Sequence, residues 1–95
     1  MGNAYVIGHI TVKDQDKWAE YRSKVPATLE AWGGELVFRG EMSTVLSGNH
    51  KHSDTVVIRF PNLKNLTSWH SSPQYQSLIS LRQEAAEIDL LAYEE

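Results

Sequence analysis

Apolar and polar residues alternate at the start of the chain, and the period of the pattern then changes. Over Ala4–Val12 every second position is small or apolar, which is the two-residue period of a β-strand. After a cap at Asp14 and an acidic first turn at Asp16, large apolar residues recur at steps of three and four as far as Gly33-Gly34. This spacing predicts an amphipathic helix with a glycine stop. Pro26 lies within this helix, where it removes an amide donor and should produce a kink.

The middle of the chain has the pattern of a β-hairpin. Glu35–Arg39 and Ser43–Ser47 both have the pattern of extended chain, and the simplest interpretation is one strand bent by a bulge at Gly40. The polar residues of Gly48–Ser53 predict a turn. Asp54–Phe60 then predicts the strand that closes the hairpin.

Helical periodicity returns in the last third of the chain, before a final strand. Pro61-Asn62 ends the hairpin strand and caps a short helix from residue 63 to about residue 70. Ser72-Pro73 starts a second helical segment, because serine at the cap and proline at the first helical position favour a helix start. The inward face of this segment is predicted to consist of Tyr75, Leu78, Ile79, Arg82 and Ala86. Ile88–Tyr93 predicts the last strand.

The order of these elements predicts the fold. Strand, helix, hairpin, helix and strand give a ferredoxin-like βαββαβ unit of the α+β class, an antiparallel sheet with two helices on one face, and we expect a single domain over residues 1–95. Leu36–Phe38 and Val56–Ile58 are apolar at consecutive positions, so both faces of the sheet carry apolar groups. Two helices on one side cannot cover both faces, so we predict a homodimer in which a two-fold partner lies against the bare face.

Several short motifs, spread over nearly the whole chain in one order, resemble a known family. They are Ala4-Tyr5-Val6-Ile7, Tyr21 with Val25-Pro26-Ala27-Thr28, Trp32-Gly33-Gly34, Arg39-Gly40, Phe60-Pro61, Trp69, Ser72-Pro73-Gln74-Tyr75 and Leu81-Arg82. Together they resemble the domain of unknown function 1330 family, within the dimeric α+β barrel superfamily. The resemblance implies a ferredoxin-like protomer that pairs sheet to sheet. It implies no particular reaction, because superfamily relatives include cofactor-free monooxygenases, muconolactone isomerases and haem-binding peroxidase-like enzymes.

Composition excludes several classes of function. The net charge is -3, from 9 basic and 12 acidic residues without a run of Lys or Arg, so nucleic acid is not an expected partner. No apolar run is long enough to span a bilayer and no basic leader segment is present, so we expect a cytoplasmic protein without a membrane partner. The absence of cysteine removes disulfides, thiolate nucleophiles and cysteine-bound metals. No dinucleotide or phosphate-loop motif is present, and we expect no cofactor.

Two arginines are candidates for holding an anionic ligand. Arg39 lies beside Gly40, where a ligand can approach closely, and its planar guanidinium suits a carboxylate. A solvated arginine, or one paired with a helix carboxylate such as Glu84, explains the same position. Arg82 lies in the apolar stripe of the last helix, where an unpaired cation is costly. It therefore requires a carboxylate partner, a ligand or an escape to solvent along its stem.

His9 and Tyr75 are the candidates for moving a proton. An imidazole titrates near neutral pH, although a histidine in mid-strand is more commonly an interior or interface residue. We expect Tyr21, Trp69 and Tyr75 on helix faces that pack against the sheet. Such faces usually belong to the hydrophobic core, but a cleft among these side chains would make Tyr21 and Trp69 ligand contacts. His50-Lys51-His52 could bind a divalent metal weakly, but a solvated loop explains these residues, and we predict no metal site.

Two kinds of function remain open after these residues are considered. One is a cofactor-free enzyme acting on a small organic acid or aromatic, with Arg39 or Arg82 orienting a carboxylate and His9 or Tyr75 moving a proton. The other is a non-catalytic, ligand-binding or stress-associated module that uses the same cleft. An enzyme needs a titrating group within hydrogen-bond reach of its ligand, whereas a binder needs only shape and charge.

Overall fold

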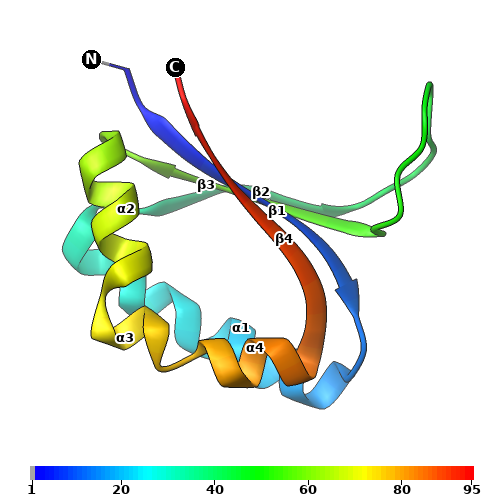
Figure 1. Cartoon of the computed structure of the whole chain (residues 1–95), viewed down its shortest axis with the longest axis horizontal. Helices are drawn as coiled ribbons and strands as arrows, with labels where there is room; N and C mark the ends of the chain where they lie inside the picture. The colour runs from blue at the N-terminus through cyan, green and yellow to red at the C-terminus, as the bar shows by residue number, and fades with distance from the viewer. Residues whose placement is uncertain (1) are drawn as a thin grey trace.

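The computed structural model describes residues 2–95 and consists of a four-stranded antiparallel sheet with helices packed on one face (Figure 1). The strands are β1 (Ala4–Val12), β2 (Glu35–Glu41), β3 (Asp54–Phe60) and β4 (Ala86–Glu94). Their spatial order is β2-β3-β1-β4, so the first and third strands form the centre of the sheet. This is the split arrangement of a ferredoxin-like unit, and it confirms the predicted α+β fold.

Three of the helices begin where the sequence supplies a capping side chain. The helices are α1 (Gln15–Leu29) with the 3-10 turn η1 (Glu30–Trp32), α2 (Leu63–Ser71), α3 (Pro73–Gln76) and α4 (Ile79–Ala85). The side chains of Asp14, Asn62 and Ser72 each accept a backbone N–H from the first turn of α1, α2 and α3, respectively. α1 continues through Pro26, and the kink stays a prediction. Within residues 2–95, no helix has the length and apolar character needed to cross a membrane.

The hydrophobic core lies between the helices and the facing side of the sheet. Trp69, Tyr75, Phe60 and Ile10 are the largest side chains that are fully buried in it. The alternation along β1 assigns its two faces as predicted, because Ala4, Val6, Gly8 and Ile10 are buried and the residues between them are half-buried. Gly8 therefore lies on the helix side of the sheet, near its centre.

Two predicted boundaries are wrong, and both errors concern strand ends. Residues 43–47 do not continue β2; they belong to a loop that joins β2 to β3 and projects beyond the sheet (Figure 1). Ala86, predicted on the inward face of a helix, is the first residue of β4 and pairs with Val12. A small buried residue satisfies either pattern, so the periodicity alone could not decide between them.

The bulge in β2 lies at Val37 instead of Gly40. Leu36 pairs with Ile58 and Phe38 with Val57, which leaves Val37 as the extra residue. One inserted residue moves every following side chain of the strand to the other face of the sheet. Arg39 therefore pairs with Val56 on the helix side. In an unbroken register the same arginine would face away from the helices.

Within residues 2–95, no helix packs on the opposite face of the sheet (Figure 1). That face carries exposed or half-buried apolar side chains from all four strands, namely Tyr5, Ile7, Phe38, Val57, Leu91 and Tyr93. Phe38 on the edge strand β2 and Tyr93 on the edge strand β4 keep 54% and 50% of their surface exposed. This open face matches the expectation of a surface that needs a partner.

Candidate functional site

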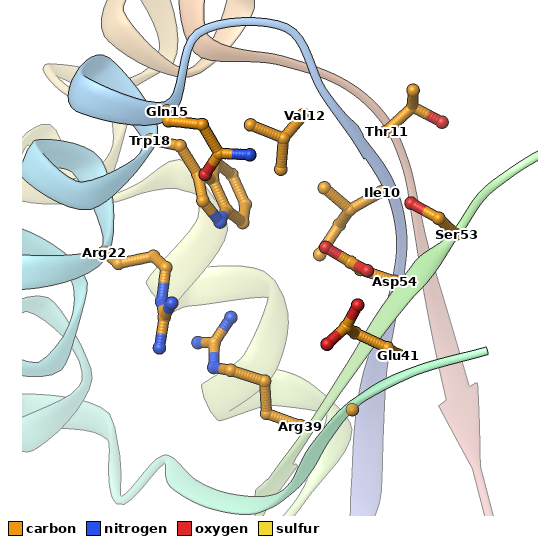
Figure 2. Close-up of a pocket in the computed structure, with 11 residues that line it drawn as sticks. Ile10, Thr11, Val12, Gln15, Trp18, Arg22, Arg39, Glu41, Ser53 and Asp54 are labelled. Carbon is orange, nitrogen blue, oxygen red and sulfur yellow. The ribbon is translucent and has the colours of Figure 1, made fainter. Parts of the chain in front are cut away.

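A cleft of about 560 Å³ opens at one end of the fold, between α1 and the neighbouring ends of β1, β2 and β3 (Figure 2). Its lining consists of Ile10, Thr11, Val12, Gln15, Trp18, Arg22, Arg39, Gly40, Glu41, Ser53 and Asp54. The volume lies within the range of about 300–1,000 Å³ found for small-molecule sites. The walls carry charges of both signs, so the cleft suits a small polar ligand better than a large apolar one.

Two guanidinium groups meet in this cleft. Arg22 projects from α1 and Arg39 from β2, and their ends point toward each other (Figure 2). Within residues 2–95, neither forms an ion pair with a carboxylate. Burial and the charge of Arg22 lower the pKa of Arg39. Two like charges held together without an acidic partner form an arrangement that an incoming anion would stabilise.

Arg39, a predicted ligand contact, lines the cleft, and so does Arg22, which the sequence analysis missed. Trp18 and Arg22 are four residues apart on α1, so they lie on one helix face and both line the cleft. This spacing was available in the sequence as a signal.

Two carboxylates form the wall across from the arginines. Glu41 ends β2 and Asp54 begins β3, and the two residues are direct partners in the strand pairing. Both point into the cleft (Figure 2). The charge of Asp54 acts on Arg39, raising its pKa against the larger effects of burial and Arg22. The site therefore separates a cationic wall from an anionic wall.

A small recess leads from the arginines toward the core. It has a volume of about 30 Å³ and shares Trp18, Arg22 and Arg39 with the cleft. Tyr21, Tyr75 and Trp69 also line it, as do Val56, Ile88 and Leu90 beneath. Gly8 lies among these last three residues, because a side chain at this position would meet all of them within 3.4 Å. A glycine in mid-strand thus keeps the recess open.

The hydroxyl groups of Tyr21 and Tyr75 form a buried pair beside this recess. They are 2.9 Å apart, and Arg82 donates from Nη1 to the Tyr75 oxygen at 2.9 Å. One hydroxyl must donate to the other, so whichever way the bond runs, one phenolic proton has no acceptor among residues 2–95. A ligand oxygen in the recess would supply that acceptor.

The environment of Tyr21 favours hydrogen-bond donation over proton abstraction. Burial raises the pKa of Tyr21 strongly, and the neighbouring Tyr75 raises it further against the opposing charges of Arg82 and Arg39. The Tyr21 hydroxyl therefore keeps its proton at any physiological pH. Tyr75, a predicted catalytic residue, lines the recess and its hydroxyl is bonded to that of Tyr21, but its role in catalysis stays a prediction.

Arg82 has a neutral partner instead of a carboxylate. Its guanidinium binds the Tyr75 hydroxyl, and its Nε is buried without a hydrogen-bond partner among residues 2–95. Arg82 does not line the cleft or the recess, so it supports the tyrosine pair from behind. Trp69 does line the recess, but its indole N–H donates to the Thr28 hydroxyl at 3.0 Å, which fixes the ring as part of the core.

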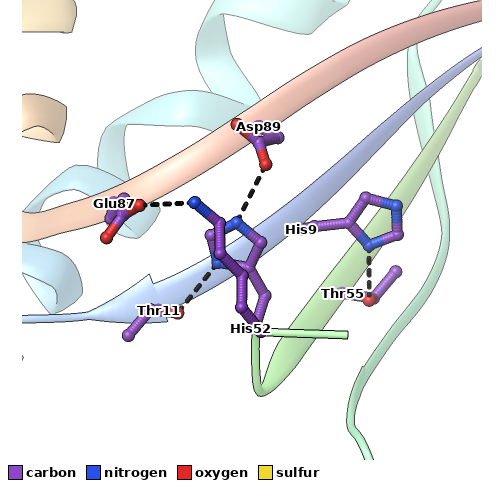
Figure 3. Close-up of polar contacts among 7 residues, drawn as sticks. His9, Thr11, His52, Thr55, Glu87 and Asp89 are labelled. Atoms are coloured by element: carbon purple, nitrogen blue, oxygen red, sulfur yellow. Dashed lines mark hydrogen bonds and ion pairs between the residues drawn. The ribbon is translucent and has the colours of Figure 1, made fainter. Parts of the chain in front are cut away.

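His9 lies on the opposite face of the sheet from the cleft. Its Nδ1 is 3.3 Å from the Thr55 hydroxyl (Figure 3). The His9 ring also packs edge-on against the ring of His50. The prediction that His9 and Tyr75 serve one site is therefore not supported by their placement. The sheet separates them, and neither the cleft nor the recess contains an imidazole.

The loop between β2 and β3 is fixed to the open face by His52. The imidazole is 2% exposed, donates from Nε2 to the Asp89 carboxylate at 3.0 Å and lies 2.8 Å from the Thr11 hydroxyl through Nδ1 (Figure 3). Lys51 adds an ion pair with Glu87. Over residues 2–95 there is no group of three or more acidic, histidine or cysteine side chains that could hold a metal ion.

Comparisons with known proteins agree on the fold. A family model described as Domain of unknown function (DUF1330) matches residues 3–95. Among curated proteins, none is detectably similar in sequence. A protein of unknown function from Rhodopseudomonas palustris superposes with a TM-score of 0.83 at 16% identity, over 99% of this chain and 82% of that one.

Two further solved structures share the fold at low identity. A dimeric ferredoxin-like protein of unknown function from Jannaschia sp. has a TM-score of 0.75 at 12% identity, over 99% of this chain and 100% of that one. SnoaB, a cofactor-independent oxygenase from Streptomyces nogalater, has a TM-score of 0.68 at 11% identity, over 100% and 94%. At these identities the likeness establishes the fold alone.

Proposed function

This chain belongs to the family described as Domain of unknown function (DUF1330), and within that family we propose that it is a homodimeric, cofactor-free enzyme that acts on a small organic acid in the Arg22–Arg39 cleft. The observation that carries the proposal is the pair of guanidinium groups that meet in the cleft without a carboxylate partner among residues 2–95. A ligand carboxylate would relieve their repulsion and accept hydrogen bonds from both.

The recess limits which part of the ligand can enter it. A volume of about 30 Å³ holds a water molecule or a single polar group, but not an aromatic ring. A carbonyl or hydroxyl oxygen of the ligand fits there, because the spare phenolic proton of the Tyr21–Tyr75 pair needs an acceptor. Of the two ligand classes expected from the sequence, the recess favours the small organic acid over the aromatic.

The catalytic form of the proposal rests on the tyrosine donor. A neutral hydroxyl aimed at a carbonyl oxygen stabilises negative charge that develops there, and it does so most strongly in a buried site. Within the described residues, the carboxylates that line the cleft and could act as a base are Glu41 and Asp54. SnoaB, which has this fold, is a cofactor-independent oxygenase, which supports the view that such a cleft can serve catalysis without a cofactor.

The homodimer is proposed from the open face of the sheet. Adjacent cross-strand partners there are Ile7, Val57, Phe38 and Leu91, and within residues 2–95 each of them is exposed or half-buried. A second copy related by a two-fold axis would bury all four with their counterparts. The Jannaschia protein of the same fold is dimeric, which is consistent with this arrangement.

A thermal-shift experiment with matched ligands tests the proposed site. Pentanoate should raise the melting temperature of the protein, whereas the neutral pentanamide should not, because ligand binding stabilises the folded state and the arginines need an anion. Arg22→Gln and Arg39→Gln should each abolish the shift. Lys64→Gln removes an exposed cation outside the cleft and should leave it intact.

The result that would reject the site is a carboxylate shift that persists in both arginine variants, or a panel of small acids that gives no shift at all. The alternative function, a non-catalytic binding module, has the same binding behaviour. It is distinguished by the fate of the acid: an enzyme converts it during incubation under air, and a binding module returns it unchanged.

A further inference from the structure

The cleft carries a second charged wall that the proposed carboxylate does not use. Glu41 and Asp54 lie directly opposite each other on β2 and β3, on the same face of the sheet. Their side chains therefore start about 5 Å apart, and like charges in this arrangement destabilise a sheet. Among residues 2–95 neither carboxylate has an ion-pair partner. The protein thus holds an acidic pair facing a basic pair across one cavity.

The backbone beneath the acidic pair is firmly held. Met42 donates its N–H to the Ser53 carbonyl at 2.6 Å, and the N–H of Ser53 donates to the Ile10 carbonyl at 3.2 Å. These bonds close the hairpin beside Glu41 and connect it to β1, so the acidic wall is part of the sheet and not of the projecting loop. Both walls are thereby set at a defined spacing.

From this geometry we propose that the ligand is a zwitterion, with its carboxylate on Arg22 and Arg39 and a cationic nitrogen on Glu41 and Asp54. This inference rests on the proposed function of the cleft and names the class of ligand that it takes. A bound ammonium group would neutralise the repulsion between the two carboxylates, just as the carboxylate neutralises that between the two arginines.

The spacing of the walls selects among zwitterions. Arg39 and Glu41 are two residues apart on one strand, which is about 6.6 Å along the sheet. The charged ends are separated further, because the Arg39 side chain extends toward Arg22 and away from Glu41 (Figure 2). The two charged groups of an α-amino acid are attached to the same carbon, so a ligand with several bonds between its charged ends matches this separation better, and an ω-amino acid is the simplest example.

Isothermal titration with four matched probes tests this inference. They are 5-aminopentanoate, its isomer norvaline with the nitrogen beside the carboxylate, pentanoate without the nitrogen, and pentylamine without the carboxylate. We expect 5-aminopentanoate to bind about tenfold or more tightly than either norvaline or pentanoate, which corresponds to about 1.4 kcal/mol. Pentylamine, which has no group for the arginines, should bind more weakly than 5-aminopentanoate.

Variants then assign the preference to the acidic pair. The double variant Glu41→Gln, Asp54→Asn should reduce the preference for 5-aminopentanoate over pentanoate to about twofold or less. The single variant Asp54→Asn, as a second and milder change, should reduce it in part. Glu30→Gln removes an exposed carboxylate outside the cleft and should leave the full preference. Circular dichroism should show that each variant is folded.

Each other outcome has one reading. If 5-aminopentanoate and pentanoate bind equally well, and both lose binding in Arg39→Gln, the proposal of a zwitterionic ligand is wrong but the proposed carboxylate site is retained. A preference that survives the double variant also overturns the zwitterionic proposal, because the nitrogen then binds elsewhere. If none of the acids binds the unmodified protein, the proposed carboxylate site fails as well.

Discussion

Replacing Arg82 by methionine tests how the buried guanidinium is held. The change removes the hydrogen bond from Nη1 to the Tyr75 hydroxyl, which is worth about 1.5–3 kcal/mol for a charged donor. It also removes Nε, a buried donor without a partner among residues 2–95, whose desolvation costs about 1–3 kcal/mol. Methionine keeps much of the apolar contact of the arginine stem.

The two effects of Arg82→Met have opposite signs and similar size. We therefore expect the free energy of unfolding to change by about 1 kcal/mol or less, which corresponds to a melting-temperature change of at most about 4–8 °C for a domain of this length. Tyr75→Phe should cost more, about 2 kcal/mol or more, because it leaves both Arg82 and Tyr21 without a side-chain partner.

Urea denaturation of both variants at one protomer concentration measures these differences, since the stability of a dimer depends on concentration. A loss of about 3 kcal/mol or more in Arg82→Met would refute the reasoning, because that is the cost of breaking a buried pair between a cation and an anion. The reverse order, with Tyr75→Phe the milder change, would refute it too.

Three further predictions concern the open face of the sheet. His52→Ala should lower the free energy of unfolding by about 1–3 kcal/mol in urea denaturation, because it removes a buried ring bonded to Thr11 and Asp89; an unchanged midpoint would show that the loop is not fixed there. The His52 hydrogen bond lowers the pKa of Asp89 below its usual 3.8, so the stability that this bond contributes is present above pH 3.8 and is lost as the pH falls through the folded-state pKa. Asp89→Asn should therefore lose less stability between pH 6 and pH 3 than the unmodified protein, and an equal loss would contradict this. Val57→Asp should give a folded monomer in sedimentation equilibrium, because Val57 faces away from the helices, whereas Ile58→Asp should give an unfolded chain, because Ile58 faces the helices and is only 6% exposed. A dimeric Val57→Asp protein would argue against the proposed interface.

The sequence predicted the elements well where a single periodicity ran without interruption. The alternation of β1, the caps at Asp14 and Asn62 and the restart at Ser72 all depend on local chemistry, and each was placed correctly. The same alternation already separated His9 from the buried side of β1. Combined with the helices on that side, it was sufficient to place His9 away from the cleft.

The candidate site could be predicted only in part, because the position of Arg39 in it depends on one inserted residue. The bulge at Val37 turns Arg39 toward the helices, and a strand of mixed apolar and polar residues does not reveal where a bulge lies. Gly8 was a signal for the recess in the sequence, because a glycine in the middle of a strand often marks a place where a ligand or another chain segment approaches closely. The partner of Arg82 depended on tertiary packing, which brings Tyr75 to it.

A crystal structure of the protein with the tightest-binding acid from the ligand panel tests the central claim most directly. The account predicts the carboxylate within hydrogen-bond distance of both Arg22 and Arg39, with an oxygen of the ligand or a water molecule in the recess beside the Tyr21–Tyr75 hydroxyls. An acid bound on the open face of the sheet, or a cleft in which the two arginines bind Glu41 and Asp54 and exclude the ligand, would contradict it.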